Sequence, residues 1–187
     1  ESAIFERVNG ALRIIASFSG LAQENMSQLA GWRFLELGRR IERAIATCRF
    51  VRQFVFASKV DSALDVLLEL ADSQITYRLR YVMVAASAPV LDLVVLDPNN
   101  PRSVVYQLGR IEAHLAALPK RTDDGRLSAP EQIATALATQ IRTAEAGTLD
   151  DAIFIHAEET LMKLADVIAA SYFTTHERAE VRWEALG

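Results

Sequence analysis

Arginines on the apolar sides of predicted helices are the residues with the most specific chemical consequence in this sequence. On a helical wheel of residues 32–57, Arg39 and Arg43 fall on an apolar side, with Glu42 at its flank. Arg78 falls in the middle of the apolar stripe of the next helix. An arginine there is costly unless a carboxylate and further hydrogen bonds satisfy it. These positions therefore predict either an ion-pair network or a binding site for an anion.

Both interpretations of these arginines remain open at the level of sequence. A structural network that fixes the register of the helices predicts that Arg78 is buried and paired, with Glu42 as the first choice of partner. A cleft that binds an anion or a peptide is the alternative, because guanidinium forks suit carboxylates and phosphates. The candidate binding residues are Arg39, Glu42, Arg43, Tyr77, Arg78, Arg80, Tyr81, Asn100, Arg102 and Ser103.

The common catalytic and cofactor motifs do not occur in the sequence. It has neither a Gly-x-x-x-x-Gly-Lys nor a Gly-x-Gly-x-x-Gly phosphate loop, so we expect no nucleotide binding by this chain alone. None of its three histidines has a glutamate three residues before it, as a di-iron bundle requires. Cys48 lies within an apolar stripe, which predicts a core residue and not a nucleophile. We therefore expect no catalytic residue, no metal and no cofactor.

Composition limits the classes of partner. The net charge is -4, with 20 basic and 24 acidic residues, so there is no basic field for nucleic acid. The most apolar stretch, 81–96, is interrupted by Pro89 and Asp92 and is too short for a span of about 20 residues, so no membrane helix is expected. A single cysteine excludes an intrachain disulfide and favours the cytoplasm.

The elements that position these residues are predicted to be helices throughout. The 51% hydrophobic content, with 8 Gly and 5 Pro in 187 residues, favours one domain of long helices. Ser128 and Glu131 have capping-box spacing, and Asn100 followed by Pro101 predicts a helix start whose N–H groups could meet an anion. We predict an all-α bundle of about six helices, with the central one, 32–57, packed on two sides. Their predicted ranges are about 3–21, 32–57, 61–86, 101–118, 129–146 and 149–172.

Four ordered blocks of sequence resemble the alpha-E family, a bacterial helical domain with a Glu-Arg motif. The resemblance is strongest before Tyr106. It implies that an earlier helical portion completes the domain, so that 1–187 would be a C-terminal part with an exposed face able to self-associate. The four blocks are Glu24–Met26, Gly31–Ala44, Tyr77–Tyr81 and Asp97–Val104.

The resemblance also supplies the two functional hypotheses. Alpha-E domains are fused to, or encoded beside, circularly permuted ATP-grasp proteins and transglutaminase-like proteins, which implies peptide or amide-bond chemistry. The first hypothesis is a helical accessory domain that docks onto an ATP-grasp ligase or presents a substrate, such as a peptide, to it. The alternative is an enzyme that uses Glu42, Tyr77, Tyr81 and the arginines as acid, base and anion clamp.

Overall fold

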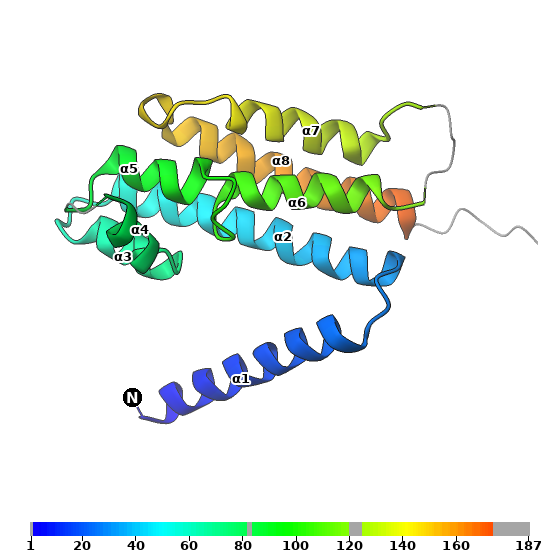
Figure 1. The fold of residues 1–187 in the computed structure, drawn as a ribbon, viewed down its shortest axis with the longest axis horizontal. Coiled ribbons are helices and arrows are strands. Elements are labelled where there is room, and N and C mark those ends of the chain that lie inside the picture. The colour runs from blue at the N-terminus through cyan, green and yellow to red at the C-terminus, as the bar shows by residue number, and fades with distance from the viewer. Residues whose placement is uncertain (1, 82–83, 120–124, 174–187) are drawn as a thin grey trace, which may run out of the picture.

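The computed structural model describes residues 2–81, 84–119 and 125–173, and these residues form helices joined by short connections (Figure 1). The predicted all-α bundle is confirmed. Two π-helical turns, η1 (Arg52–Ala57) and η2 (Asp92–Leu96), extend helices, and a 3₁₀ turn, η3 (Ala146–Thr148), precedes the last one. The α-helices are α1 (Ser2–Asn25), α2 (Ala30–Val51), α3 (Ala63–Leu70), α4 (Gln74–Tyr81), α5 (Ser87–Leu91), α6 (Val104–Ala116), α7 (Ala129–Arg142) and α8 (Asp151–Tyr172).

Helix α2 is the centre of the bundle and packs against both α6 and α8, while α7 covers the side of α6 and α8 away from α2 (Figure 1). Its buried stripe comes from residues at helical spacing, among them Leu37, Ile41 and Cys48, all at most 5% exposed. Each fully buried leucine or isoleucine stabilises the fold by roughly 1.5–3 kcal/mol. Cys48 is 0% exposed, which confirms its predicted place in the core, and this burial raises the pKa of its thiol to about 12.

The predicted helix 61–86 is interrupted, which is a correction to the sequence interpretation. Asp72 adopts a positive φ of 48°, and the N–H of Ser73 donates to the Leu68 carbonyl at 2.8 Å, closing α3 in the manner of a Schellman motif. Glycine is the usual residue at such a position, and no glycine marks this one. The chain then turns into α4, so residues after 73 do not continue the stripe of α3.

The start of α6 is also corrected, from Asn100–Pro101 to Ser103. The Ser103 hydroxyl accepts a hydrogen bond from the N–H of Tyr106 at 3.0 Å and donates one to the carbonyl of Asp97. Asn100 lies in the preceding turns, where its side-chain amide donates to Ser73 Oγ and to the Leu93 carbonyl. Asn100 and Ser103 therefore hold residues 97–103 against the bundle.

Caps elsewhere follow the sequence more closely. The N–H of Ser128 donates to a carboxylate oxygen of Glu131 at 2.7 Å, which confirms the predicted capping box at the start of α7. Thr148 and Asp151 also have capping-box spacing in the sequence. In the structure α8 is instead capped by Asp150, whose carboxylate accepts from the N–H of Ile153. The sequence also predicts a polar loop at residues 120–127, of which 120–124 lie outside the described residues.

Helix α1 stands apart from this bundle and contributes nothing to its hydrophobic core (Figure 1). It approaches α2 near the turn that joins them and diverges from it toward the N-terminus. Among the described residues of α1, Ala22 alone is buried. No helix in the described ranges is long and apolar enough to cross a membrane. Large apolar side chains that remain more than half exposed on α1 are Ile4, Phe5, Val8, Leu12, Ile14, Ile15, Phe18 and Leu21.

We predict that Ser103→Ala lowers the free energy of unfolding by about 1–3 kcal/mol, because it removes the cap of α6 and leaves the Asp97 carbonyl without its donor. Urea denaturation measures the change. Ser171→Ala is the matched control, since its hydroxyl bonds only to the Val167 carbonyl on an exposed turn, and it should shift stability by less than about 0.5 kcal/mol. Equal effects of the two changes would contradict the capping role.

Candidate functional site

A groove of about 420 Å³ lies between α1 and α2 and collects four of the ten candidate residues, Arg39, Glu42, Arg43 and Arg102. Helix α2 supplies most of its floor through its second apolar side, where Ala46 and Phe50 are only partly buried. The groove therefore combines arginines with apolar surface. The remaining lining residues are Ile15, Ser19, Thr47, Leu70 and Ala71.

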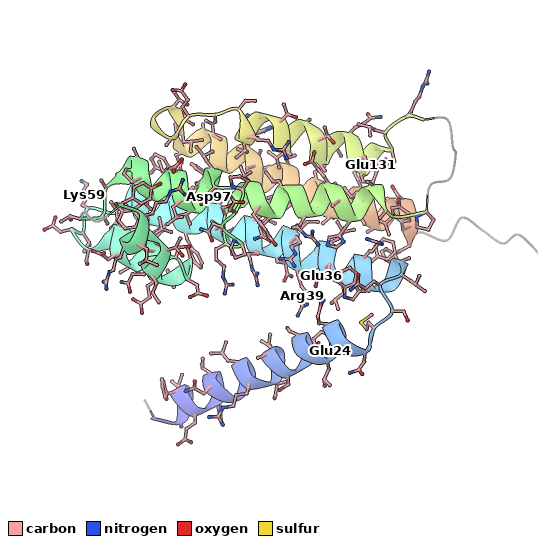
Figure 2. All side chains as sticks on the ribbon, viewed as in Figure 1. Glu24, Glu36, Arg39, Lys59, Asp97 and Glu131 are labelled. Atoms are coloured by element: carbon pink, nitrogen blue, oxygen red, sulfur yellow. The ribbon has the colours of Figure 1, made fainter. Side chains whose placement is uncertain are left out.

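Glu36 anchors the arginines at one end of the groove. Its side chain is 4% exposed, and it accepts from Arg39 at 2.9 Å and from Arg40 at 2.6 Å. Figure 2 shows Arg39 on the side of α2 that faces α1, where it also donates to the hydroxyl of Ser19. Burial alone would raise the pKa of the Glu36 carboxyl, but the hydrogen bonds and charges of the two arginines lower it below its ordinary value.

Sequence reasoning did not select Glu36, although its spacing carried a signal. Glu36 precedes Arg39 by three residues and Arg40 by four, which places all three on neighbouring positions of one helical face. Arg40 also reaches Gln107 of α6 at 3.5 Å, so this cluster joins α2 to α6. The buried carboxylate is thus local to α2, whereas we had expected Glu42 to reach Arg78.

Arg43 is the arginine of the groove whose guanidinium makes no ion pair or hydrogen bond with the residues that the structure describes. Partial desolvation in the groove lowers its pKa first, and the positive charges of Arg102, Arg40 and Arg39 lower it further, against a smaller opposing effect of Glu36. Guanidinium nevertheless stays protonated at neutral pH. Arg43 is therefore an exposed cation in a locally positive environment.

Arg102 closes the other end of the groove from the loop before α6. Its guanidinium binds Asp72 at 2.6 Å, and its carbonyl accepts from the hydroxyl of Thr47 at 3.5 Å. The Asp72 side chain is 74% exposed, so this ion pair is the kind that contributes little and exchanges readily with water. The positive φ that ends α3 thus also places Asp72 opposite Arg102.

The tyrosines and the other two arginines lie elsewhere. Tyr77 is buried, and its hydroxyl accepts from the N–H of Ala86 at 3.2 Å. Arg80 binds Asp97 at 2.7 Å, and the Tyr81 hydroxyl donates to Asp92. Desolvation, followed by that hydrogen bond, raises the pKa of Tyr81 to about 12. The structure does not bring these residues into one cleft with Glu42.

The prediction for Arg78 is wrong. Arg78 is exposed and lines a separate cavity of about 330 Å³ beside Tyr77, with no ion pair to any described residue. Glu42 is also exposed and makes no ion pair within the described residues. The break at Asp72 explains the error, because the stripe on which Arg78 was placed ends with α3.

A second charged network lies at the other end of α2 and was not foreseen. Arg49 binds Glu158 at 3.0 Å, and Arg52 binds both Glu158 at 3.1 Å and Asp151 at 2.8 Å. Glu158 is 9% exposed at its side chain, so these bonds tie α2 and η1 to α8. No local spacing could reveal partners that are about a hundred residues apart, as the 99 and 106 residues of separation for Arg52 show. Within the described residues, no group of His, Cys, Asp or Glu side chains could hold a metal ion.

A family model described as a predicted alpha-helical domain with a conserved ER motif, Alpha-E, matches residues 2–173. The chain belongs to the Alpha-E family. Its similar relatives include uncharacterised proteins from Mycobacterium tuberculosis and Mycobacterium bovis, each 29% identical over 184 residues and 96% of this chain. The chain spans about a fifth of the length of these relatives, at 20% of each. No solved structure matches it.

The groove lies within the residues that the Alpha-E model matches. Two Glu-Arg pairs occur in the matched residues, Glu6–Arg7 on α1 and Glu42–Arg43 on α2. The second pair lies in the groove, where the glutamate and the arginine are both exposed and do not pair with each other. In this Alpha-E chain, that Glu-Arg pair therefore lies on an accessible surface and not in the hydrophobic core.

We predict that Glu36→Gln lowers the free energy of unfolding at pH 7 by about 1–3 kcal/mol, less than for a fully buried pair because both arginines still reach solvent. The folded-state pKa of Glu36 is lowered, so its contribution is present above the unfolded pKa of about 4.3 and is lost as the pH falls through the folded pKa. The difference between parent and variant should therefore shrink below about pH 4.

Denaturant midpoints measured from neutral to acid pH check this expectation. Glu42→Gln on the same helix is the matched control, because Glu42 is exposed and makes no ion pair within the described ranges. It should leave stability within about 0.5 kcal/mol of the parent at every pH. A Glu36→Gln variant as stable as the parent at pH 7 would show that Glu36 does not hold the two arginines.

Proposed function

We propose that this Alpha-E domain is a helical accessory domain that docks onto an ATP-grasp ligase, or presents a peptide to it, through α1 and the groove beside it. The observation that carries the proposal is the apolar face of α1. Ile4, Phe5 and Ile14 are 69%, 70% and 71% exposed on a helix that the bundle does not cover. Contiguous exposed apolar surface of this kind marks sites of protein interaction.

The distribution of side chains around α1 supports docking over a simple surface helix. On a wheel of 100° per residue, the apolar side chains of α1 cover more than half of its circumference, whereas Glu6, Arg13 and Glu24 share the opposite side. Ile15 faces the groove, while Ile14 and Leu21 lie farther round the helix. When apolar side chains cover this much of a helix, the side chains that do not face α2 also favour burial against another surface.

The choice of an ATP-grasp ligase as the partner rests on the resemblance to Alpha-E domains, which are fused to or encoded beside such proteins. The lengths of the relatives are compatible with it, because the matching region is about a fifth of each relative. In those proteins the domain is joined to a much longer polypeptide. In a docking role, the ligase would cover the exposed apolar face of α1, and no reactive side chain of this chain would be needed.

The alternative of an enzyme is less well supported by the geometry. It required Glu42, Tyr77 and Tyr81 to line one cleft, and the structure separates Glu42 from both tyrosines. Tyr77 is 2% exposed, and Tyr81 binds Asp92 and packs against Arg80. No acid and base meet at a common substrate position among these residues.

The test is binding between this chain and an ATP-grasp protein as the proposed partner, measured by isothermal titration. We predict that the triple change Ile4→Gln, Val8→Gln and Phe18→Gln weakens binding by at least about a hundredfold, since each lost apolar contact of about 1.4 kcal/mol is worth tenfold. The matched control is Arg13→Gln on the polar side of α1, which should leave the affinity unchanged.

Two results would contradict the proposal. The first is the absence of binding between the parent chain and the ATP-grasp protein. The second is binding that the triple change on α1 does not weaken. Circular dichroism should show that the triple variant keeps its helical content, because these side chains make no contribution to the core.

We also predict that the chain alone does not bind ATP, because its sequence has no glycine-rich phosphate loop. Isothermal titration with ATP should show no binding at micromolar affinity, which corresponds to about -8 kcal/mol. The mixture with the ligase should bind ATP only as well as the ligase does by itself. A micromolar affinity of the isolated chain would favour a catalytic role and would contradict the accessory function.

A further inference from the structure

We infer that the groove between α1 and α2 binds an acidic, amphipathic helical segment of the partner, with a carboxylate of that segment held by Arg43. This inference rests on the proposed docking function and names the part of the partner that enters the groove. The charges of the groove and its apolar lining both support this occupant.

The charges of the groove are incompletely balanced. Arg39 already has partners, because its guanidinium donates to Glu36 and to Ser19. Arg43 has no carboxylate partner among the described residues, and three neighbouring arginines disfavour its charge. An incoming carboxylate would accept the two N–H groups of the fork of Arg43 and relieve that repulsion.

Arg102 can join Arg43 in holding an anion. Its present partner, Asp72, is 74% exposed, so the ion pair is dynamic and weak. Both guanidiniums line the same groove, one from α2 and one from the loop that precedes α6. Glu42 is the one acidic residue of the lining, and it lies about 100° round α2 from Arg43. On the side of Arg43, a carboxylate therefore meets one unpaired cation and a second, Arg102, whose present ion pair is weak.

The apolar lining favours a peptide over a small anion. Ile15, Phe50 and Leu70 come from three different helices or their extensions and line the same space as the arginines. A phosphate or a free carboxylate would leave these side chains in contact with water. A helix with apolar residues at i, i+3 and i+4 and glutamates at their flank satisfies both kinds of surface.

Side chains of both α1 and α2 line the groove. The two helices meet at their connecting turn and diverge from it (Figure 1), and the groove of about 420 Å³ lies between them. A second copy of this chain fits the charges less well, because α1 carries two glutamates and two arginines and brings no net negative charge. The partner segment that fits is acidic on one side and apolar on the other.

The experiment uses two synthetic helical peptides as probes and fluorescence anisotropy with the 187-residue chain. The acidic probe carries leucines at i, i+3, i+4 and i+7 with flanking glutamates, and the neutral probe has glutamine at each glutamate. The acidic probe should bind at least about tenfold more tightly, and the difference should shrink as the ionic strength rises above about 0.15 M.

The variants locate the binding. Arg43→Gln should remove most of the difference between the two probes, whereas Arg78→Gln, an exposed arginine in another cavity, should preserve it. Ala46→Trp fills the groove without changing its charge and should weaken both probes. Arg43→Gln should keep the melting temperature of the parent, because its guanidinium holds no described partner.

Four results would overturn the inference. The first is equal binding of the two probes, and the second is an equal effect of Arg43→Gln and Arg78→Gln on the difference between them. The third is displacement of the acidic probe by inorganic phosphate at a concentration close to the dissociation constant of the probe. The fourth is self-association of the chain through the groove in place of probe binding. The proposed function is tested separately through the apolar face of α1. If the triple change on α1 weakens the ligase complex but Arg43→Gln does not, the proposed docking through α1 is supported and the inference of an acidic segment in the groove is wrong.

Discussion

The arrangement of this domain depends on α2 having two apolar sides, one buried in the bundle and the other only partly covered. Leu37, Ile41 and Cys48 pack within the core against α6 and α8. The other side, with Ala46 and Phe50, faces α1, and α1 comes close only near the turn that joins the two helices. Apolar surface left open beside an exposed apolar helix is unfavourable in water. A partner that covers both surfaces gains the free energy of their burial.

Glu36 holds two of the arginines that make the surroundings of this side of α2 positive. One buried carboxylate is shared by Arg39 and Arg40, so the two guanidiniums are held in place without being fully neutralised. Arg43, one turn farther along α2 from Arg39, then lies in a positive field. The chain as a whole carries a net charge of -4, yet three arginines line this groove. The proposed preference for an acidic partner therefore rests on the local placement of charge and not on the overall balance.

The sequence predicted what periodicity and strong caps determine, namely the all-α bundle, the central helix and the Ser128–Glu131 capping box. It failed where tertiary structure overrode a local pattern. The positive φ of Asp72 ended a helix without a glycine to mark it, and this moved Arg78 to the surface. The partners of Arg52 lie about a hundred residues away in sequence and leave no local signal. Four candidates meet in the groove because they share one face of α2 or the loop that packs on it.

Hydrogen–deuterium exchange of the chain, alone and with an ATP-grasp protein as the proposed partner, tests the central claim most directly. Without the partner, the amides of α1 should exchange far faster than those of α6 and α8, because a helix with so little tertiary packing opens locally at low cost. With the partner, protection should appear along α1 and the groove side of α2, and α7 should not change. Strong protection of α1 in the isolated chain, or new protection confined to α7 and α8, would contradict a docking surface formed by α1 and α2.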